Sequence, residues 1–225
     1  MIKLKDILFE QEFPDIFIPR RTEDRVDRYI KNYIKNGSKG NLTISHMRLK
    51  RLPDILSKIE VEGNFTCAGN FIESLENFPK SVGGAIDVSY NLIKSLEGMN
   101  IEEVNGNRSL TGDAFDCNGN YLRNLIGGPK VVNGNYYCSE NDLVSLEGAP
   151  KKVNGLFYCV HNKLTSLVGA PEYVGNSFSA NFNQLTSLEG LPKFIGGHLS
   201  LLATKKIFTR EEIRTMSSII GKIEL

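Results

Sequence analysis

Residues 140–157 read ENDLVSLEGAPKKVNGLF, and residues 161–178 read HNKLTSLVGAPEYVGNSF. The second stretch is close to a copy of the first, displaced by 21 residues along the chain. Self-similarity at a fixed period of roughly 20 to 50 residues is typical of solenoids and other repeat architectures. This repeat therefore indicates a repeat architecture for the chain.

The repeated unit carries the pattern Φ-x-Φ-x-x-N-x-Φ-x-x-L, in which Φ is apolar. Successive asparagines are 21, 29, 21, 21 and 21 residues apart, so the long interval is one repeat with an eight-residue insertion within residues 99–114. We expect each asparagine amide to bond backbone groups of its own and neighbouring coils that would otherwise be buried unpaired. The six asparagines are Asn70, Asn91, Asn120, Asn141, Asn162 and Asn183.

The pattern resembles the L-x-L-x-x-N-x-L signature of leucine-rich repeat proteins over about residues 41–204. The resemblance implies a solenoid with a parallel β-sheet on its concave side. The pattern supports this, because Φ-x-Φ alternates like a strand and a 21-residue coil buries its apolar edge only by stacking. The return segment, SLEGAPxxVGG, departs from the family because it is too short and too rich in Gly and Pro for an α-helix. There we expect turns, polyproline or a short second strand on the convex side.

The segments beside the array predict helical caps, which the open ends of a solenoid need. Thr22 and Gly37 suit the start and end of a first helix, and Thr209 and Glu212 have the capping-box spacing at the start of a second. The expected buried stripes contain Val26, Tyr29, Ile30, Tyr33 and Ile34 in the first helix, and Ile213, Met216 and Ile220 in the second.

The chain is therefore divided into an N-terminal segment with a capping helix (1–40), the solenoid (41–204) and a C-terminal capping helix (205–225). A composition of 40% hydrophobic and 24% charged residues allows a core. The net charge of +1 argues against a dedicated nucleic-acid binder. Because no apolar run approaches the roughly 20 residues that span a bilayer, we expect no membrane partner.

The cysteines all stand three residues before an asparagine, and no two form a C-x-x-C pair. One shared inward position favours small buried hydrophobic residues with free thiols over metal ligands, and disulfides between parallel rungs would be strained. Free thiols suggest a reducing compartment. The three histidines do not converge, so we predict no metal site and no cofactor. The four cysteines are Cys67, Cys117, Cys138 and Cys159.

The outward positions around each strand are not dictated by the core, so they are the candidate binding residues. Stacked coils would place acids over the middle rungs and aromatic residues after them, a composition typical of binding surfaces. The alternative is that ladders of tyrosine only stabilise the parallel strands. The predicted concave-face site contains Asp87, Tyr90, Asp116, Asn118, Tyr137, Glu140, Tyr158, His161 and Phe182.

Two of these residues, Asp87 and Asp116, fall on adjacent rungs once the insertion is removed. Two carboxylates on adjacent rungs could bind a cation or share a proton, or could simply be solvated. The sequence offers no third ligand and no nucleophile–base pair, so we predict no catalytic residue and no enzyme.

The first ten residues, MIKLKDILFE, have Asp6 and Glu10 inside the apolar stretch and do not form a secretory signal. They resemble the capsid-targeting peptides of T-even-like tailed bacteriophages, in which a protease cuts after Leu/Ile-x-Glu. The short repeats are also similar to those of uncharacterised proteins of such phages. The resemblance implies processing after Leu8, Phe9 and Glu10 and a location in the host cytoplasm or on the virion. An N-terminal turn packed on the cap is the alternative.

Together these features predict a non-enzymatic module that binds a protein partner, from the host or the virion, through its concave face. The insertion around Asn105–Asp113 offers a second contact beside the acidic rungs. The alternative function is that of a minor virion or capsid-associated structural protein held by its N-terminal peptide.

Overall fold

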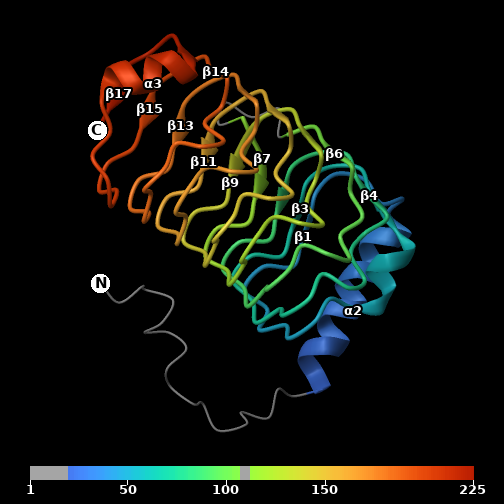
Figure 1. Cartoon of the computed structure of the whole chain (residues 1–225). Coiled ribbons are helices and arrows are strands. Elements are labelled where there is room, and N and C mark those ends of the chain that lie inside the picture. The colour runs from blue at the N-terminus through green and yellow to red at the C-terminus, as the bar shows by residue number, and fades with distance from the viewer. Residues whose placement is uncertain (1–19, 107–111) are drawn as a thin grey trace, which may run out of the picture.

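The computed structural model describes residues 20–106 and 112–225, with side chains from residue 25 onward. The chain forms stacked coils that run from helix α2 (Arg20–Lys35) at one end to helix α3 (Arg210–Met216) at the other (Figure 1). This confirms the predicted parallel β-solenoid. The proposed processing site at Leu8, Phe9 and Glu10 lies outside the described residues.

One short strand of each coil joins a nine-stranded sheet in which every neighbouring pair is parallel. The register repeats from coil to coil, with one shift beside β7, so Phe157 pairs with Tyr136 on one side and with Phe178 on the other. The nine strands are β1 (Leu42–Thr43), β3 (Phe65–Thr66), β5 (Ile86–Asp87), β7 (Asp113–Asp116), β9 (Asn135–Tyr137), β11 (Phe157–Tyr158), β13 (Phe178–Ser179), β15 (Leu199–Ser200) and β17 (Ile223–Glu224).

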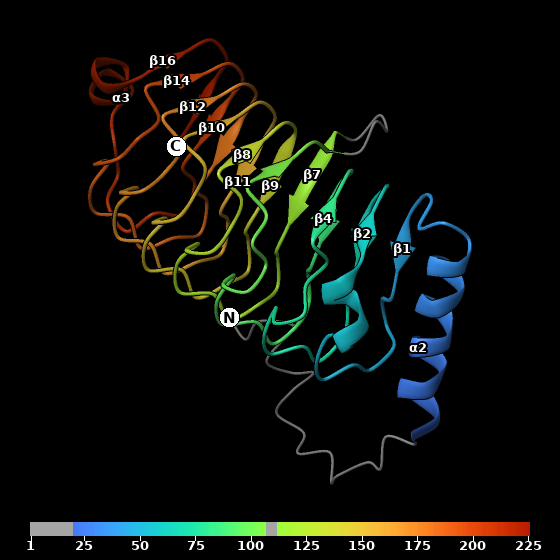
Figure 2. The same ribbon diagram turned by 90° about the vertical axis from the view of Figure 1, so that its right-hand side faces the viewer.

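The return segments form a second set of short parallel strands, one of the outcomes expected from the sequence (Figure 2). They divide into a six-stranded and a two-stranded sheet. A 3-10 helix at Asp54–Lys58 precedes the two-stranded sheet. The strands are β6 (Glu103–Val104), β8 (Val131–Val132), β10 (Lys152–Val153), β12 (Tyr173–Val174), β14 (Phe194–Ile195) and β16 (Ser218–Ile219), with β2 (Glu60–Val61) and β4 (Ser81–Val82) in the pair.

The insertion explains why the second set of strands is interrupted between β4 and β6. Val104 follows Asn91 by 13 residues, whereas Val132 follows Asn120 by 12, so one extra residue precedes β6. The other extra residues lie between β6 and β7, where the register shifts between Asp113 and Phe115. The regular repeat resumes at β7.

The apolar repeat positions fill one continuous core between the sheets. The position five residues before each asparagine forms a column of rings, in which Phe115, Tyr136, Phe157 and Phe178 follow one another with centroids 5.0, 5.2 and 5.5 Å apart. Aromatic pairs at these separations attract one another beyond the area they bury. The repeat therefore supplies both hydrophobic burial and a fixed stacking distance.

The asparagines form a buried hydrogen-bonded ladder, as predicted. Asn141 Nδ2 donates to the carbonyl of Cys138 in its own coil at 3.3 Å and to that of Cys117 in the preceding coil at 3.0 Å. Its Oδ1 accepts from the backbone N–H of Leu122 in the preceding coil at 3.1 Å. The other asparagines repeat this arrangement, so each amide pairs backbone groups of two coils at once.

The cysteines lie in one fully buried column and are free thiols. Cys117 Sγ lies 3.3 Å from the carbonyl oxygen of Tyr137, and Cys138 Sγ lies 3.4 Å from that of Tyr158. A thiol is a weak donor, so each contact adds little to stability beyond packing. The prediction that these residues are core hydrophobes is confirmed.

The two ends of the array differ from the predicted pair of helical caps. In α2, Val26, Ile30 and Tyr33 are buried, but Tyr29, which the sequence placed in the same stripe, is 42% exposed. Tyr33 Oη lies 2.6 Å from the carbonyl oxygen of Ser38, so the tyrosine holds the turn after the helix.

Only part of residues 205–225 forms the predicted C-terminal helix. Thr209 caps α3 by accepting from the N–H of Glu212, as predicted, but the helix has only seven residues. Beyond it the apolar residues follow strand periodicity: Ile223 is buried, and strands β16 and β17 extend the two sheets. Ile213 is buried, whereas Met216 and Ile220 are 42% and 71% exposed, so the predicted stripe is wrong at these two residues.

Removing one rung of the asparagine ladder should destabilise the whole array. Asn141→Ala leaves the N–H of Leu122 and the carbonyls that Asn141 bonds without this partner. We expect a loss of about 2 to 4 kcal/mol in the free energy of unfolding, measured by urea denaturation. Asn176→Ala, at an exposed asparagine, is the control and should change it by less than about 0.5 kcal/mol. Equal effects of the two substitutions would contradict the ladder.

The thiol column should be unreactive until the protein unfolds. Burial raises the pKa of all four cysteine thiols, so the reactive thiolate is scarce at neutral pH. We expect a thiol reagent such as Ellman's reagent to modify no cysteine of the native protein quickly and all four in denaturant. Rapid modification of any one of them in the native state would show that its coil is open.

Candidate interaction surface

Three columns of side chains, those four, two and one residues before each asparagine, cover the outer face of the nine-stranded sheet. The sequence predicted binding at this face. We call the residues four before each asparagine the strand column, and those immediately before it, together with the equivalent residues of the two end coils, the turn column. The strand column contains Thr66, Asp87, Asp116, Tyr137, Tyr158 and Ser179, which are register neighbours in successive strands. The turn column contains His46, Gly69, Tyr90, Gly119, Glu140, His161, Phe182 and Ala203.

Every residue of the turn column has a positive φ, between 52° and 66°. Here the chain turns sharply from the strand so that the next residue can enter the core. Glycine adopts this conformation freely, whereas other residues there carry strain, and strained residues cluster at functional sites. Six of the eight positions nevertheless carry side chains, which include Tyr90, His161 and Phe182.

The turn column is also packed along its length. The imidazole of His161 stacks on the ring of Phe182 with centroids 4.4 Å apart and an interplanar angle of 7°. Tyr90 lies over Gly119, where an added Cβ would overlap the phenol ring. The exposed fractions of Tyr90 and Phe182 are 52% and 45%, so each ring is fixed on one side and open to solvent on the other.

Tyr137 is not the freely exposed side chain that the sequence suggested. Its hydroxyl donates to Asp113 Oδ1 at 2.9 Å and accepts from Asn135 Nδ2 at 2.9 Å. Its ring meets that of Tyr158 edge to face at 5.9 Å. Burial and the hydrogen bond to Asp113 raise the pKa of Tyr137 to about 12. Tyr137 therefore ties the end of the insertion to the sheet.

The two acids of the strand column lie on adjacent strands, as predicted. Each carboxylate accepts hydrogen bonds from the residue two positions further along its own coil. Asp87 Oδ1 accepts from the backbone N–H and the hydroxyl of Ser89, and Asp116 Oδ1 accepts from the N–H of Asn118 at 2.9 Å. Burial raises the pKa of Asp116 from 3.8 to about 7, and the charges of Asp87 and Asp113 add to this rise. Asp116 is therefore poised to gain a proton near neutral pH.

Residues two before the asparagine hold neighbouring coils together. Asn118 Oδ1 accepts from the N–H of Ser139 at 2.6 Å, and Ser139 Oγ accepts from the N–H of Val160 at 3.1 Å. The predicted site residue Asn118 thus has a structural partner on the next rung. Glu140, Tyr158 and His161 are half-buried.

Sequence reasoning missed Asp113 and Asn135, because they lie outside the asparagine-centred pattern, one of them at the end of the insertion. It also missed an aromatic contact on the six-stranded sheet, where Tyr173 and Phe194 stack at 4.9 Å. The nitrogen Nζ of Lys152 lies 5.1 Å from the centre of the Tyr173 ring. These contacts link β10, β12 and β14, which the sequence predicted only as one of several possible forms of the return segment.

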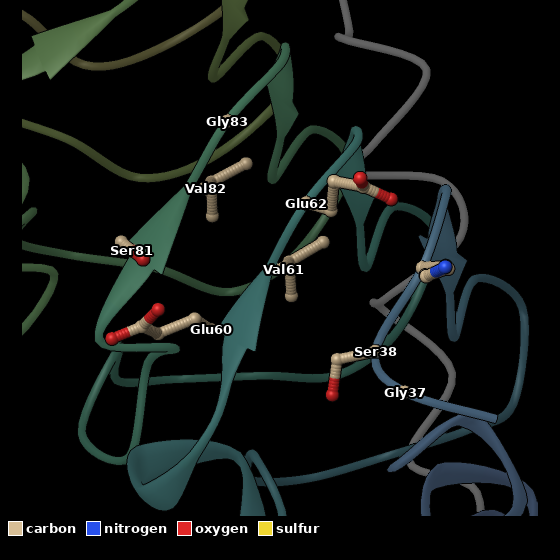
Figure 3. Close-up of a pocket in the computed structure, with 9 residues that line it drawn as sticks. Gly37, Ser38, Glu60, Val61, Glu62, Ser81, Val82 and Gly83 are labelled. Atoms are coloured by element: carbon tan, nitrogen blue, oxygen red, sulfur yellow. The ribbon is translucent and has the colours of Figure 1, made fainter. Parts of the chain in front are cut away.

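The structure also has a shallow hollow of about 410 Å³ at the open edge of strand β2, between that strand and the turn after α2 (Figure 3). Among the described residues, β2 pairs with β4 on one side, and its other edge, beside the hollow, has no partner strand. The N–H of Gly40 donates to Glu62 Oε2 at 2.9 Å, which fixes the turn beside the hollow. The hollow lies on a different sheet from the predicted site residues.

Neither helix in residues 20–106 and 112–225 combines the length and the apolar composition that a membrane crossing requires. In the same part of the chain, His, Cys, Asp and Glu side chains nowhere form a group of three or more that could hold a metal ion.

Comparison with known proteins supports the fold. No protein-family model matches the sequence, and the search of curated proteins gave no significant match. Among solved structures, the chain is similar to the leucine-rich repeat domain of a Shigella effector, with a TM-score of 0.55 and 15% sequence identity. The similarity covers 97% of this chain and 94% of that one. The chain therefore has a leucine-rich-repeat-like fold, and the suggested link to bacteriophages stays a prediction.

The raised pKa of Asp116 gives a stability that depends on pH. Between pH 4 and 7 the folded protein keeps a proton that the unfolded chain releases, so the free energy of unfolding falls as pH rises through this window. Asp116→Asn removes this term and should gain stability relative to wild type, by at most about 4 kcal/mol at pH 7 and by little at pH 4. Urea denaturation at both values measures the difference.

The matched control is Glu189→Gln, which removes one exposed carboxylate. It should not reproduce the change between pH 4 and 7. If Asp116→Asn and wild type kept a constant stability difference over this range, the carboxyl group would not be buried as described.

Proposed function

We propose that this protein is a non-enzymatic interaction module that binds a protein partner through the turn column and the adjoining strand column. The observation that carries the proposal is the set of rings at Tyr90, His161 and Phe182, each held in a left-handed turn. The rings of Tyr90 and Phe182 are open to solvent, and His161 stacks on Phe182. Rigid aromatic side chains are the residues that most often dominate binding energy at protein interfaces.

The construction of the face supports the same function. The ladders of Asn141 and its equivalents fix the spacing of successive coils, and Asn118 and Ser139 bond across rungs. A surface fixed in this way loses little conformational entropy when a partner binds. The acids Asp87 and Glu140 lie on the same face and favour a partner with basic side chains opposite them.

The test begins with the contact itself. A photo-crosslinking amino acid is placed at position 90, at position 182 or, on the six-stranded sheet, at position 173, and adducts formed in expressing cells are identified by mass spectrometry. We expect positions 90 and 182 to capture the same protein and position 173 not to capture it. Capture from position 173 alone would move the interface to the other sheet.

The captured partner is then purified and its affinity measured against variants of the turn column. Tyr90→Gly and Phe182→Gly remove the rings but keep the left-handed turn, as Gly69 and Gly119 do in neighbouring coils. Each should weaken binding at least about tenfold while leaving the melting temperature within a few degrees of wild type. Ile207→Gly, at a 91% exposed residue outside the face, should leave the affinity unchanged.

A further inference from the structure

A second hollow lies where α2 meets the first coil, at the His46 end of the turn column. Its volume is about 380 Å³, which is within the range of roughly 300 to 1,000 Å³ typical of small-ligand sites. It lies between the first described side chains of α2 and the turn that follows β1. We call it the arginine hollow, and it is lined by Arg25, Val26, Tyr29, His46, Met47 and Arg48.

The charge of the arginine hollow has one sign. Arg25, Arg48 and His46 line it, and none of the acidic side chains that the structure describes does. None of the side chains that the structure describes forms an ion pair with Arg25 or Arg48, although other surface cations such as Lys130 and Lys193 have carboxylate partners. Two guanidinium groups without a partner in one concave site attract an anion.

The backbone that presents these groups is unusual for the array. Both His46 and Arg48 have positive φ, 55° and 58°, whereas in the regular coils that the structure describes the residue after the asparagine does not. In this coil Met47 replaces the asparagine, and Asn70 Oδ1 accepts from the N–H groups of Met47 and Leu49 at 2.8 and 3.1 Å. Asn70 therefore holds a strained turn, and strain of this kind is a recognised mark of a binding site.

The other lining residues supply an apolar wall and an imidazole held in a fixed place. Tyr29 is 42% exposed and Met47 is partly buried against the core, so a ring and a thioether face the same space. A thioether contacts aromatic rings favourably. The imidazole of His46 is placed by Gly69, where an added Cβ would overlap it. The hollow thus combines two guanidinium groups, an imidazole and an apolar wall.

We propose that the arginine hollow binds a phosphate monoester carried on an aromatic ring. A guanidinium group pairs with phosphate oxygens through two parallel hydrogen bonds, which is why arginine is preferred for such ligands. The ring of the ligand then lies against Tyr29 and Met47. The ligand is either a free aryl phosphate or a phosphorylated tyrosine of another protein, and the chemistry at the site is the same. The inference does not depend on the interface assigned to the turn column.

The experiment titrates the full chain with phenyl phosphate at fixed ionic strength by isothermal titration calorimetry. We expect saturable one-to-one binding, and weaker binding of inorganic phosphate, which lacks the ring. Arg25→Gln and Arg48→Gln should each weaken phenyl phosphate binding at least tenfold, because each removes a charge-assisted pair. Arg48→Gly, which suits the left-handed turn, provides a second variant if Arg48→Gln is unstable.

Lys50→Gln is the matched control, since it removes the same charge two residues from Arg48 on an exposed side chain outside the hollow. It should change the affinity less than twofold. A peptide with phosphotyrosine and its unphosphorylated form make up the second arm. Tighter binding of the phosphopeptide than of phenyl phosphate indicates a protein source, and equal binding indicates that the small ester is sufficient.

Two results would overturn the proposal. One is the absence of saturable binding of both phenyl phosphate and the phosphopeptide. The other is equal weakening by Lys50→Gln and by the arginine substitutions, which would mean that a diffuse positive field rather than the hollow attracts the anion.

Discussion

Each coil must pair the backbone groups that it buries where it leaves its strand, and the stacking of the coils follows from this pairing. A chain that turns inward there buries N–H and C=O groups that water cannot reach, and each would cost free energy if left unpaired. The asparagine amide has donors and an acceptor in one planar group. Asn91 uses them to bond the carbonyls of Cys67 and Val88 and the N–H of Ile72. The same side chain therefore closes its own turn and fixes the preceding coil.

The candidate surface is a consequence of this turn. Because the asparagine enters the core, the residue before it must adopt the left-handed conformation, and its side chain is displayed beside the sheet. Stacking repeats that geometry in successive coils, so that side chains such as Tyr90, His161 and Phe182 share one column. At the first coil Met47 takes the asparagine position, the turn changes, and the basic hollow beside α2 results. The turn column and the arginine hollow thus both lie where an asparagine side chain holds the backbone in a left-handed turn.

The sequence predicted well those features that depend on the repeat period alone. The phase of the asparagines correctly placed Cys117, Cys138 and Cys159 in one buried column and brought Asp87 beside Asp116. The left-handed column was not predicted, although Gly69 and Gly119 at this position are residues that adopt such a conformation freely.

Features that depend on broken periodicity could not be predicted in the same way. The bond from Tyr137 to Asp113 requires the register shift beside the insertion, which no spacing reveals. At the C-terminal end a capping box correctly marked the start of α3. Its short length depends on the pairing of β16 with β14, a tertiary contact that overrides local helix signals.

Hydrogen exchange at three backbone amides measures the strength of the asparagine ladder itself. The N–H groups of Leu122, Leu143 and Leu164 have asparagine side chains, not backbone carbonyls, as their partners. If the ladder holds the coils together, NMR will show these amides exchanging as slowly as those of the central strands, only on global unfolding. Exchange of these three amides within minutes, while the strand amides stay protected, would contradict the account.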